Sequence, residues 1–357
     1  MSVQMMTTRG AEAQFADRMQ QALTGAAVTM MTSVGHQTGL FDVMATMPPS
    51  TSGEIAAAAK LQERYVREWL AAMATASVLT YDPADDTFAL PQAHVRALTR
   101  SGGTDNVATL AQLLASVAAT EGRLVKAFRC GGGVSYGQFR NLGAIVAETS
   151  DAVLCTRLDA VAEVSPSLRE RLRAGIEVLD LGCGRGRAAM LFARRYPRSR
   201  FVGIDLSLEN ITAAREEAES HGLDNVTFQV GDAATLSDED RFGLVIAFNT
   251  IHEQASPETV LGAIHRSMKK GAMFLMIEPD GSSELQENLD HPLATVLYTI
   301  SCFLSIPVSQ AAGGEGLGLM WGREKAVAML RATGFTDVRV EPLAYDPINA
   351  CFVATRR

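Results

Sequence analysis

Apolar positions in the first third of the chain recur at helical spacing. Residues 12–39 contain few helix breakers until two glycines near the end of that stretch. A Pro pair and a Ser/Thr cap with Glu54 close behind then predict a short helix. Residues 62–79 predict an amphipathic helix, and residues 80–91 predict a small hairpin with an acidic turn. Helix, helix, helix, hairpin is the order of a winged helix.

The pattern changes in the second half. A Gly-rich break at 130–139 precedes a further helix to about Leu172, after which short apolar runs alternate with amphipathic segments up to residue 279. Such alternation predicts a parallel sheet covered on both faces. The chain then closes with a helix ended by Gly334 and two strands, predicted to pair antiparallel at the sheet edge. We therefore expect a helical domain over residues 1–125 and an α/β domain over residues 126–357.

Composition narrows the class. Apolar residues make up 47% and charged residues 20% of the 357 residues, as in ordinary globular proteins. We see no apolar run close to the ~20 residues of a membrane span, and no apolar centre of a signal peptide. Five cysteines are scattered without a CxxC pair, which predicts reduced thiols in a soluble cytoplasmic protein. They are Cys130, Cys155, Cys183, Cys302 and Cys351.

Charge bears on whether the winged helix contacts DNA. The formal net charge is −8, and residues 1–100 hold seven Lys/Arg against nine Asp/Glu. The hairpin turn reads "DPADD", which would repel phosphates. The candidate recognition helix interleaves Glu63 and Glu68 with its two arginines. A structural or dimerisation role is therefore favoured, and we expect no nucleic-acid partner; a DNA-binding regulator that senses a ligand is the alternative.

The sharpest motif is "VLDLGCGRGRAAML", residues 178–191. Gly182, Gly184 and Gly186 would let the backbone turn tightly beside a ligand. Their GxGxG spacing differs from the GxGxxG turn that cradles a pyrophosphate. The carboxylate of Asp180, at the end of the predicted strand, would also repel a pyrophosphate. A carboxylate there suits an ammonium group, such as that of the methionine part of S-adenosylmethionine.

Two further acids follow predicted strands in order. Asp205 comes 19 residues after Gly186, where a carboxylate can accept both ribose hydroxyls of a nucleoside. Asp232 and Ala233 follow the third strand, where they would meet an adenine edge. The alternative is a Rossmann-like domain that binds some other nucleotide.

These motifs resemble the class I S-adenosylmethionine-dependent methyltransferases. "VLDLGCGRG", "GIDLS", "GDA" and "GLVIAFNTIHE" match that family's successive motifs over about residues 175–280. The resemblance implies a Rossmann-like seven-stranded sheet with the last strand antiparallel. It also implies S-adenosylmethionine as donor and S-adenosylhomocysteine as product, with further donor contacts from Leu206 and Asn249.

The longer layout resembles a more specific group. The winged-helix front end, "NLDHPLATVLYTISC" and "GGEGLGLMWG" are similar to an actinobacterial subgroup of dimeric methyltransferases and to natural-product O-methyltransferases. That resemblance implies a homodimer formed through the N-terminal domain, which helps to close the site.

The segment "FNTIHEQASPE" follows the apolar run 242–247. In small-molecule O-methyltransferases a "LHDW"-type segment carries the general base, which this resemblance places on His252. Glu253 replaces the Asp of that pattern and Gln254 its Trp, so the wall facing the acceptor differs. A histidine with a pKa near 6.5 can take a proton from a hydroxyl at neutral pH. The alternative is a histidine that caps the next helix.

Residues 281–320 form a long insertion with apolar content and a Gly-rich exit, which predicts a lid over an apolar pocket. His291 lies in it and could converge with His252. Related C-methyltransferases of α-keto acids use two His to hold a metal, which stays an alternative with no obvious third ligand beyond Glu148 or Glu253.

The acceptor is predicted to be a small molecule. The (D/N)PP(Y/F) signature of amino-methylating enzymes is absent after the fourth strand, where "FNTIHE" stands instead. We expect a small apolar or aromatic hydroxylated acceptor, or an enolisable keto acid, with O-methylation favoured.

Overall fold

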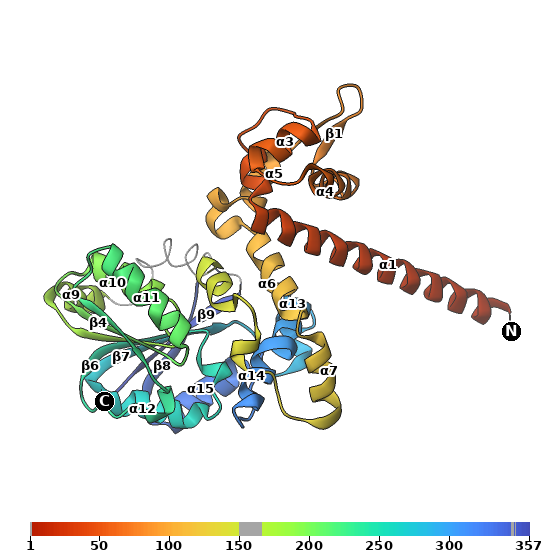
Figure 1. The fold of residues 1–357 in the computed structure, drawn as a ribbon. Helices are drawn as coiled ribbons and strands as arrows, with labels where there is room; N and C mark the ends of the chain where they lie inside the picture. Colours follow the sequence, from red (N-terminus) through yellow and green to blue (C-terminus); the bar gives the residue numbers. More distant parts are fainter. Residues whose placement is uncertain (1, 150–165, 344–345, 347) are drawn as a thin grey trace. The chain divides into compact units, whose positions relative to one another are not determined.

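The structure is a computed structural model, described here for residues 2–149, 166–343, 346 and 348–357 (Figure 1). It separates into two compact units, Met1–Ala115 and Ser116–Arg357. Helix α6 (Ala108–Ala118) crosses that division, and residue 125, where the sequence analysis divided the chain, lies within α7 (Glu121–Cys130). Cys155 lies outside the described residues.

The first unit is a winged helix, as predicted. A hairpin of β1 and β2 follows four helices, and Thr51 with Glu54 forms a capping box at the start of α3. The core gathers Phe41, Trp69 and Leu70, each no more than 3% exposed. The elements are α1 (Ser2–Thr38), α2 (Leu40–Met44), α3 (Ser52–Ala59), α4 (Glu63–Thr75), β1 (Thr80–Asp82), β2 (Thr87–Ala89), α5 (Gln92–Leu98) and η1 (Arg100–Asp105).

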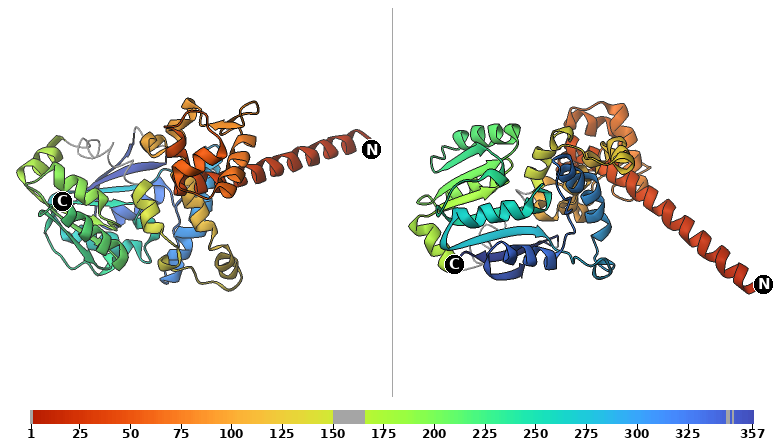
Figure 2. Two further views of the ribbon diagram at one scale, coloured as in Figure 1. Left: turned by 45° about the horizontal axis from the view of Figure 1, so that its top comes forward. Right: turned by 90° about the horizontal axis from the view of Figure 1, so that it is seen from below.

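Helix α1 runs far out from the rest of this unit (Figures 1 and 2). Five large apolar side chains on it are 44–69% exposed: Phe15, Met19, Leu23, Met30 and Val34. At about 100° per residue they fall within roughly a 100° arc of the helix. These five side chains therefore share one exposed side of the helix, hereafter the α1 stripe.

The second unit is built on a seven-stranded sheet in the order β5-β4-β3-β6-β7-β9-β8. All neighbours from β5 to β7 pair in parallel, and β9 runs antiparallel to both β7 and β8. This confirms the predicted sheet and its C-terminal antiparallel pair. The strands are β3 (Glu177–Leu181), β4 (Arg200–Asp205), β5 (Val226–Val230), β6 (Phe242–Phe248), β7 (Met268–Pro279), β8 (Thr336–Pro342) and β9 (Asn349–Thr355).

Helices cover both faces of this sheet, because its central strands are apolar on both sides (Figure 1). One core lies under α9, α10 and α11, and the other under α12 and α15. The parallel strands end at a common edge, which is where open α/β sheets bind ligands. The helices are α9 (Pro166–Ala174), α10 (Arg187–Arg195), α11 (Leu208–Ser220), α12 (Pro257–Ser267) and α15 (Arg323–Ala332).

The insertion after β7 is largely helical: η5 (Leu285–Asn288), α13 (Ala294–Ile300), the π-helical turn η6 (Ser301–Ser305) and α14 (Ile306–Ala311). In the described part of the chain, residues 294–311 are long and apolar enough to cross a membrane, with a mean hydropathy of 1.3. The expectation that no run approaches this length was therefore wrong. Ser301 and Ser309 on this stretch hydrogen-bond the backbone of the second unit, so the stretch is integrated in the fold, and we call it the lid helix.

Candidate active site

The glycine turn between β3 and α10 has three residues with positive φ, at 67°, 53° and 74° for Gly182, Gly184 and Gly186. A Cβ on Gly182 would lie 2.4 Å from Thr250, and one on Gly186 would lie 2.4 Å from the Phe228 ring. A Cβ on Gly184 would meet nothing within 4 Å. Two glycines thus let the turn pack closely, and the third borders open space that a ligand can occupy.

Asp205, the last residue of β4, lies directly beside that space. Its Oδ2 accepts a hydrogen bond from the N–H of Gly184 at 2.9 Å, and its Oδ1 accepts one from Ser207 at 2.8 Å. Leu206, the next residue, is 67% exposed. The geometry brings together the glycine turn and the predicted ribose acid.

Asp180 is the next-to-last residue of β3, near the strand end where the sequence predicted it. It lies within β3, is 2% exposed, and its Oδ2 accepts from the N–H of Ala189 at 3.2 Å, which ties the strand to α10. Burial raises the pKa of Asp180 to about 7. Its contact with the donor's ammonium stays a prediction.

The remaining predicted donor contacts lie at the same edge of the sheet. Asp232 caps η3 (Ala233–Thr235) by accepting from Ala234, and Ala233 is buried. Asn249 follows β6 in the left-handed conformation, with φ 49°, and its N–H donates to Ile277. Each therefore follows a parallel strand, as the sequence indicated.

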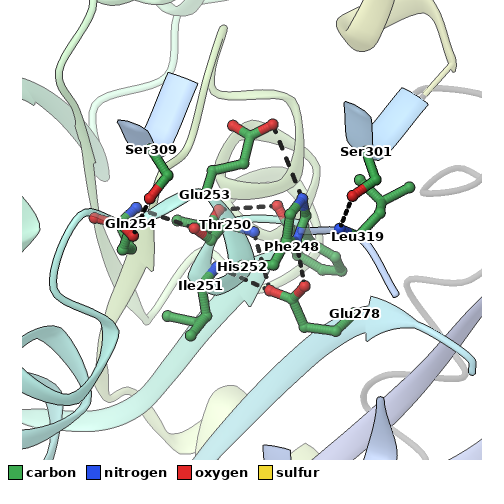
Figure 3. A network of polar contacts seen from close by, with 10 residues as sticks. All are labelled: Phe248, Thr250, Ile251, His252, Glu253, Gln254, Glu278, Ser301, Ser309 and Leu319. Atoms are coloured by element: carbon green, nitrogen blue, oxygen red, sulfur yellow. Dashed lines mark hydrogen bonds and ion pairs between the residues drawn. The ribbon is translucent and has the colours of Figure 1, made fainter. Parts of the chain in front are cut away.

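His252 lies in η4 (Ile251–Glu253), just past the end of β6, and is 1% exposed. Its Nδ1 forms a short hydrogen bond with Oε2 of Glu278, a fully buried carboxylate on β7 (Figure 3). The other oxygen of Glu278 accepts from the N–H groups of Thr250 and Ile251, at 3.2 and 2.8 Å. One carboxylate thus fixes both the loop and the imidazole.

The second nitrogen of His252 is different. Among the described residues Nε2 has no hydrogen-bond partner, although it is buried. The nearest charge is Oε1 of Glu253, 3.9 Å away (Figure 3). Burial alone favours the neutral imidazole, but the carboxylates of Glu278 and Glu253 outweigh it and raise the pKa of His252. Burial also raises the pKa of Glu253.

Sequence reasoning missed Glu278. It stands in "AMFLMIEP", a single carboxylate inside an apolar strand. A charge there is costly to bury unless it is paired, so the lone Glu was the available signal.

Tyr136 lies near both halves of the site. Its hydroxyl lies near the side chain of Asn210, whose amide Nδ2 donates to Oδ1 of Asp205 at 3.5 Å. Burial raises the pKa of Tyr136, and the charges of Glu253 and Asp205 raise it further. Tyr136 therefore has donor-side and base-side carboxylates as neighbours.

His291 has a local role. Its Nδ1 accepts from the N–H of Leu293, two residues along the same turn. Within the described ranges, no three His, Cys, Asp or Glu side chains are grouped to hold a metal ion. The proposed convergence of His291 with His252 gains no support from these contacts.

Comparison with known families matches both units. Residues 172–303 match the methyltransferase domain family, and residues 26–100 match the Rv2258c-like winged HTH domain. The chain carries a class I S-adenosylmethionine-dependent methyltransferase domain behind a winged-helix domain. The open space at Gly184 and the acid beside it fit this donor.

Solved structures are similar to this chain over nearly its whole length. A putative O-methyltransferase from Nostoc punctiforme PCC 73102 is 17% identical, with TM-score 0.72, over 96% of this chain and 98% of that chain. The mitomycin 7-O-methyltransferase MmcR is 19% identical, with TM-score 0.70, over 97% and 99%. Human N-acetylserotonin methyltransferase in complex with S-adenosylmethionine is 20% identical, with TM-score 0.66, over 96% and 98%. At these identities the likeness establishes the fold.

Curated relatives match over about a third of this chain. (S)-Coclaurine N-methyltransferase of Papaver somniferum is 28% identical over 30% of this chain and 31% of that protein. Trans-aconitate 2-methyltransferase of Methylobacterium nodulans is 30% identical over 34% of this chain and 45% of that protein. The chain thus spans a third to a half of the length of these relatives.

Proposed function

We propose that this protein transfers a methyl group from S-adenosylmethionine to a hydroxyl of a small apolar or aromatic acceptor, with His252 as general base. The pairing of His252 with Glu278 carries the proposal. It stands at the end of β6, and Thr250, two residues before His252, packs against Gly182 of the donor-binding turn.

The chemistry follows from the tautomer. Oε2 of Glu278 accepts the Nδ1–H, which leaves the lone pair on Nε2, the nitrogen with no hydrogen-bond partner among the described residues. Nε2 can then take the proton of an acceptor hydroxyl. The donor supplies an electrophilic methyl carbon on a sulfonium. The protein's part is to orient the acceptor oxygen and to remove its proton.

The test is transfer of labelled methyl from S-adenosylmethionine to a pooled panel of phenols, hydroxy acids and α-keto acids. His252→Ala is expected to bind the donor normally and lose activity ~100-fold or more. Asp205→Ala is expected to lose donor binding itself, measured by calorimetry. Full turnover by His252→Ala would remove the base assignment, and chelator-sensitive label on carbon would favour metal-assisted C-methylation.

We further propose a cytoplasmic homodimer that does not bind DNA. The α1 stripe supports self-association, since solvent-exposed apolar faces of this length mark interfaces. On α4, Arg64 pairs with Glu68 and Arg67 with Glu63, both at 2.6 Å, so both arginines of the candidate recognition helix are already engaged. The four described cysteines are free thiols, which suits a reducing compartment.

A further inference from the structure

The lid helix carries three buried serines at four-residue spacing. Ser301 is 4% exposed, and Ser305 and Ser309 are fully buried. Residues four apart share one face of a helix, so the three hydroxyls form a polar row along an otherwise apolar segment. Buried hydroxyls in an apolar helix normally have hydrogen-bond partners.

Two of the three hydroxyls have structural partners. Ser301 Oγ accepts from the N–H of Leu319 at 2.9 Å. Ser309 Oγ donates to the carbonyl of Gln254 at 3.0 Å and accepts from the N–H of Gly316 at 3.2 Å. These bonds fix the helix to the loop that carries His252 and to the Gly-rich exit.

The middle hydroxyl is different. Among the described residues, Ser305 Oγ is buried and has no hydrogen-bond partner. Ser305 is also the last residue of η6, and π-helical turns are frequent at functional sites. A buried unpaired hydroxyl is unfavourable in the free protein, so the residue has no evident structural purpose.

Its position points to the acceptor. Figure 3 shows Ser301 and Ser309 on opposite sides of His252, and helix α14 packs against η4. Ser305 lies midway between those serines along the helix. His252 Nε2 is likewise a buried atom without a hydrogen-bond partner in the described chain. The lid helix and the loop after β6 thus each carry one buried polar atom without a hydrogen-bond partner among the described residues.

We propose that Ser305 is an acceptor-binding residue. Its hydroxyl hydrogen-bonds a second oxygen of the acceptor, while His252 removes the proton from the oxygen that is methylated. The acceptor class is then an aromatic compound with two oxygens rather than a simple phenol. Both atoms are closed off from solvent, so entry requires the lid helix to move outward. The proposal rests on the proposed O-methyltransferase activity.

The test compares Ser305→Ala with Ser301→Ala and Ser309→Ala as matched controls. Because Ser305 has no partner to lose, its variant should unfold at or above the wild-type temperature. The two control variants break real hydrogen bonds and should unfold about 2–8 °C lower. A drop for Ser305→Ala equal to that of Ser309→Ala would show a structural role and overturn the proposal.

Kinetics supply the second readout. For catechol and other two-oxygen phenols in the panel, Ser305→Ala should raise KM about five- to tenfold with kcat little changed, and affinity for S-adenosylhomocysteine should stay the same. Unchanged KM for every accepted two-oxygen substrate would overturn this inference alone. If the wild-type protein binds donor but labels nothing, the proposed function fails, and this inference with it.

Discussion

The side chain of Glu278 determines which ring nitrogen of His252 carries the proton. Glu278→Gln keeps the size and shape of the side chain but has one acceptor oxygen. That oxygen is needed by the N–H groups of Thr250 and Ile251, so the amide NH₂ would face Nδ1 and force the proton onto Nε2. We expect kcat to fall ~100-fold or more, with donor affinity retained in calorimetry. Wild-type kcat in this variant would show that the pair does not set the base.

The same pair predicts a pH profile. The pKa of His252 is raised, so the imidazole stays protonated to a higher pH than an ordinary histidine and is the active base only above it. We therefore expect kcat/KM to rise with pH along a limb centred above ~6.5. Glu253→Gln removes one of the charges that raise this pKa and should move the limb to lower pH. A limb at or below pH 6.5 in the wild type would contradict the assignment.

The buried Asp180 should change folding stability with pH in the opposite direction to a carboxylate that is paired with a cation. Its folded pKa of about 7 lies above the unfolded value near ~3.9, so the folded state keeps a proton that the unfolded state releases between these values. Stability should therefore fall as pH rises from ~4 to ~7, by up to about 1.4 kcal/mol per pH unit. Asp180→Asn can still accept from Ala189 and should escape this loss, as thermal unfolding at pH 5 and pH 8 would measure.

The donor gives Asp180 a second test. If its carboxylate meets the donor's ammonium, the bound cation favours the ionised form. Affinity for S-adenosylhomocysteine should then increase as pH rises through 7 in the wild type and stay flat in Asp180→Asn. Parallel profiles for the two proteins would restrict Asp180 to its bond with α10.

At the scale of the element, different glycines of the turn are expected to serve packing and donor binding. Gly184→Ala places a methyl group in open space, so its cost to stability is the ~1–2 kcal/mol of a left-handed residue. Donor affinity should nevertheless fall at least ~10-fold, because that methyl occupies the proposed donor's path. Gly186→Ala is the matched control: its methyl would meet Phe228, so its main loss should be in unfolding temperature. Normal donor affinity in Gly184→Ala would show that the donor does not occupy the space beside Gly184.

The elements were largely predictable from sequence because their signals are local. Apolar strands alternating with amphipathic helices were enough for the sheet and its antiparallel pair. Asp205 could be predicted as a ribose acid because it ends the strand that follows the glycine turn. Glu278 was missed because its meaning is tertiary: only the pairing of β6 with β7 brings it to His252. Ser305 is the same case, since nothing in its neighbours along the chain tells a paired hydroxyl from an unpaired one.

At the scale of the whole molecule, the α1 stripe predicts the oligomeric state. In a two-fold dimer each copy contributes the same patch, so one substitution acts twice. Leu23→Glu replaces a 69%-exposed leucine in the middle of the stripe. Losing ~1.5–3 kcal/mol of apolar burial per copy should weaken dimerisation by ~10²–10⁴-fold. Light scattering after gel filtration should then find a wild-type dimer and a Leu23→Glu monomer.

Gln21→Glu is the control, because it adds the same charge to α1 about 170° away from the middle of the stripe. It should leave the dimer intact. Both variants should bind S-adenosylhomocysteine normally, since the donor residues all lie in the second unit. A loss of turnover in Leu23→Glu with donor binding intact would then show that the dimer is needed for the acceptor half of the site. A wild-type monomer, or a dimer that survives Leu23→Glu, would show that the α1 stripe is not a dimer interface.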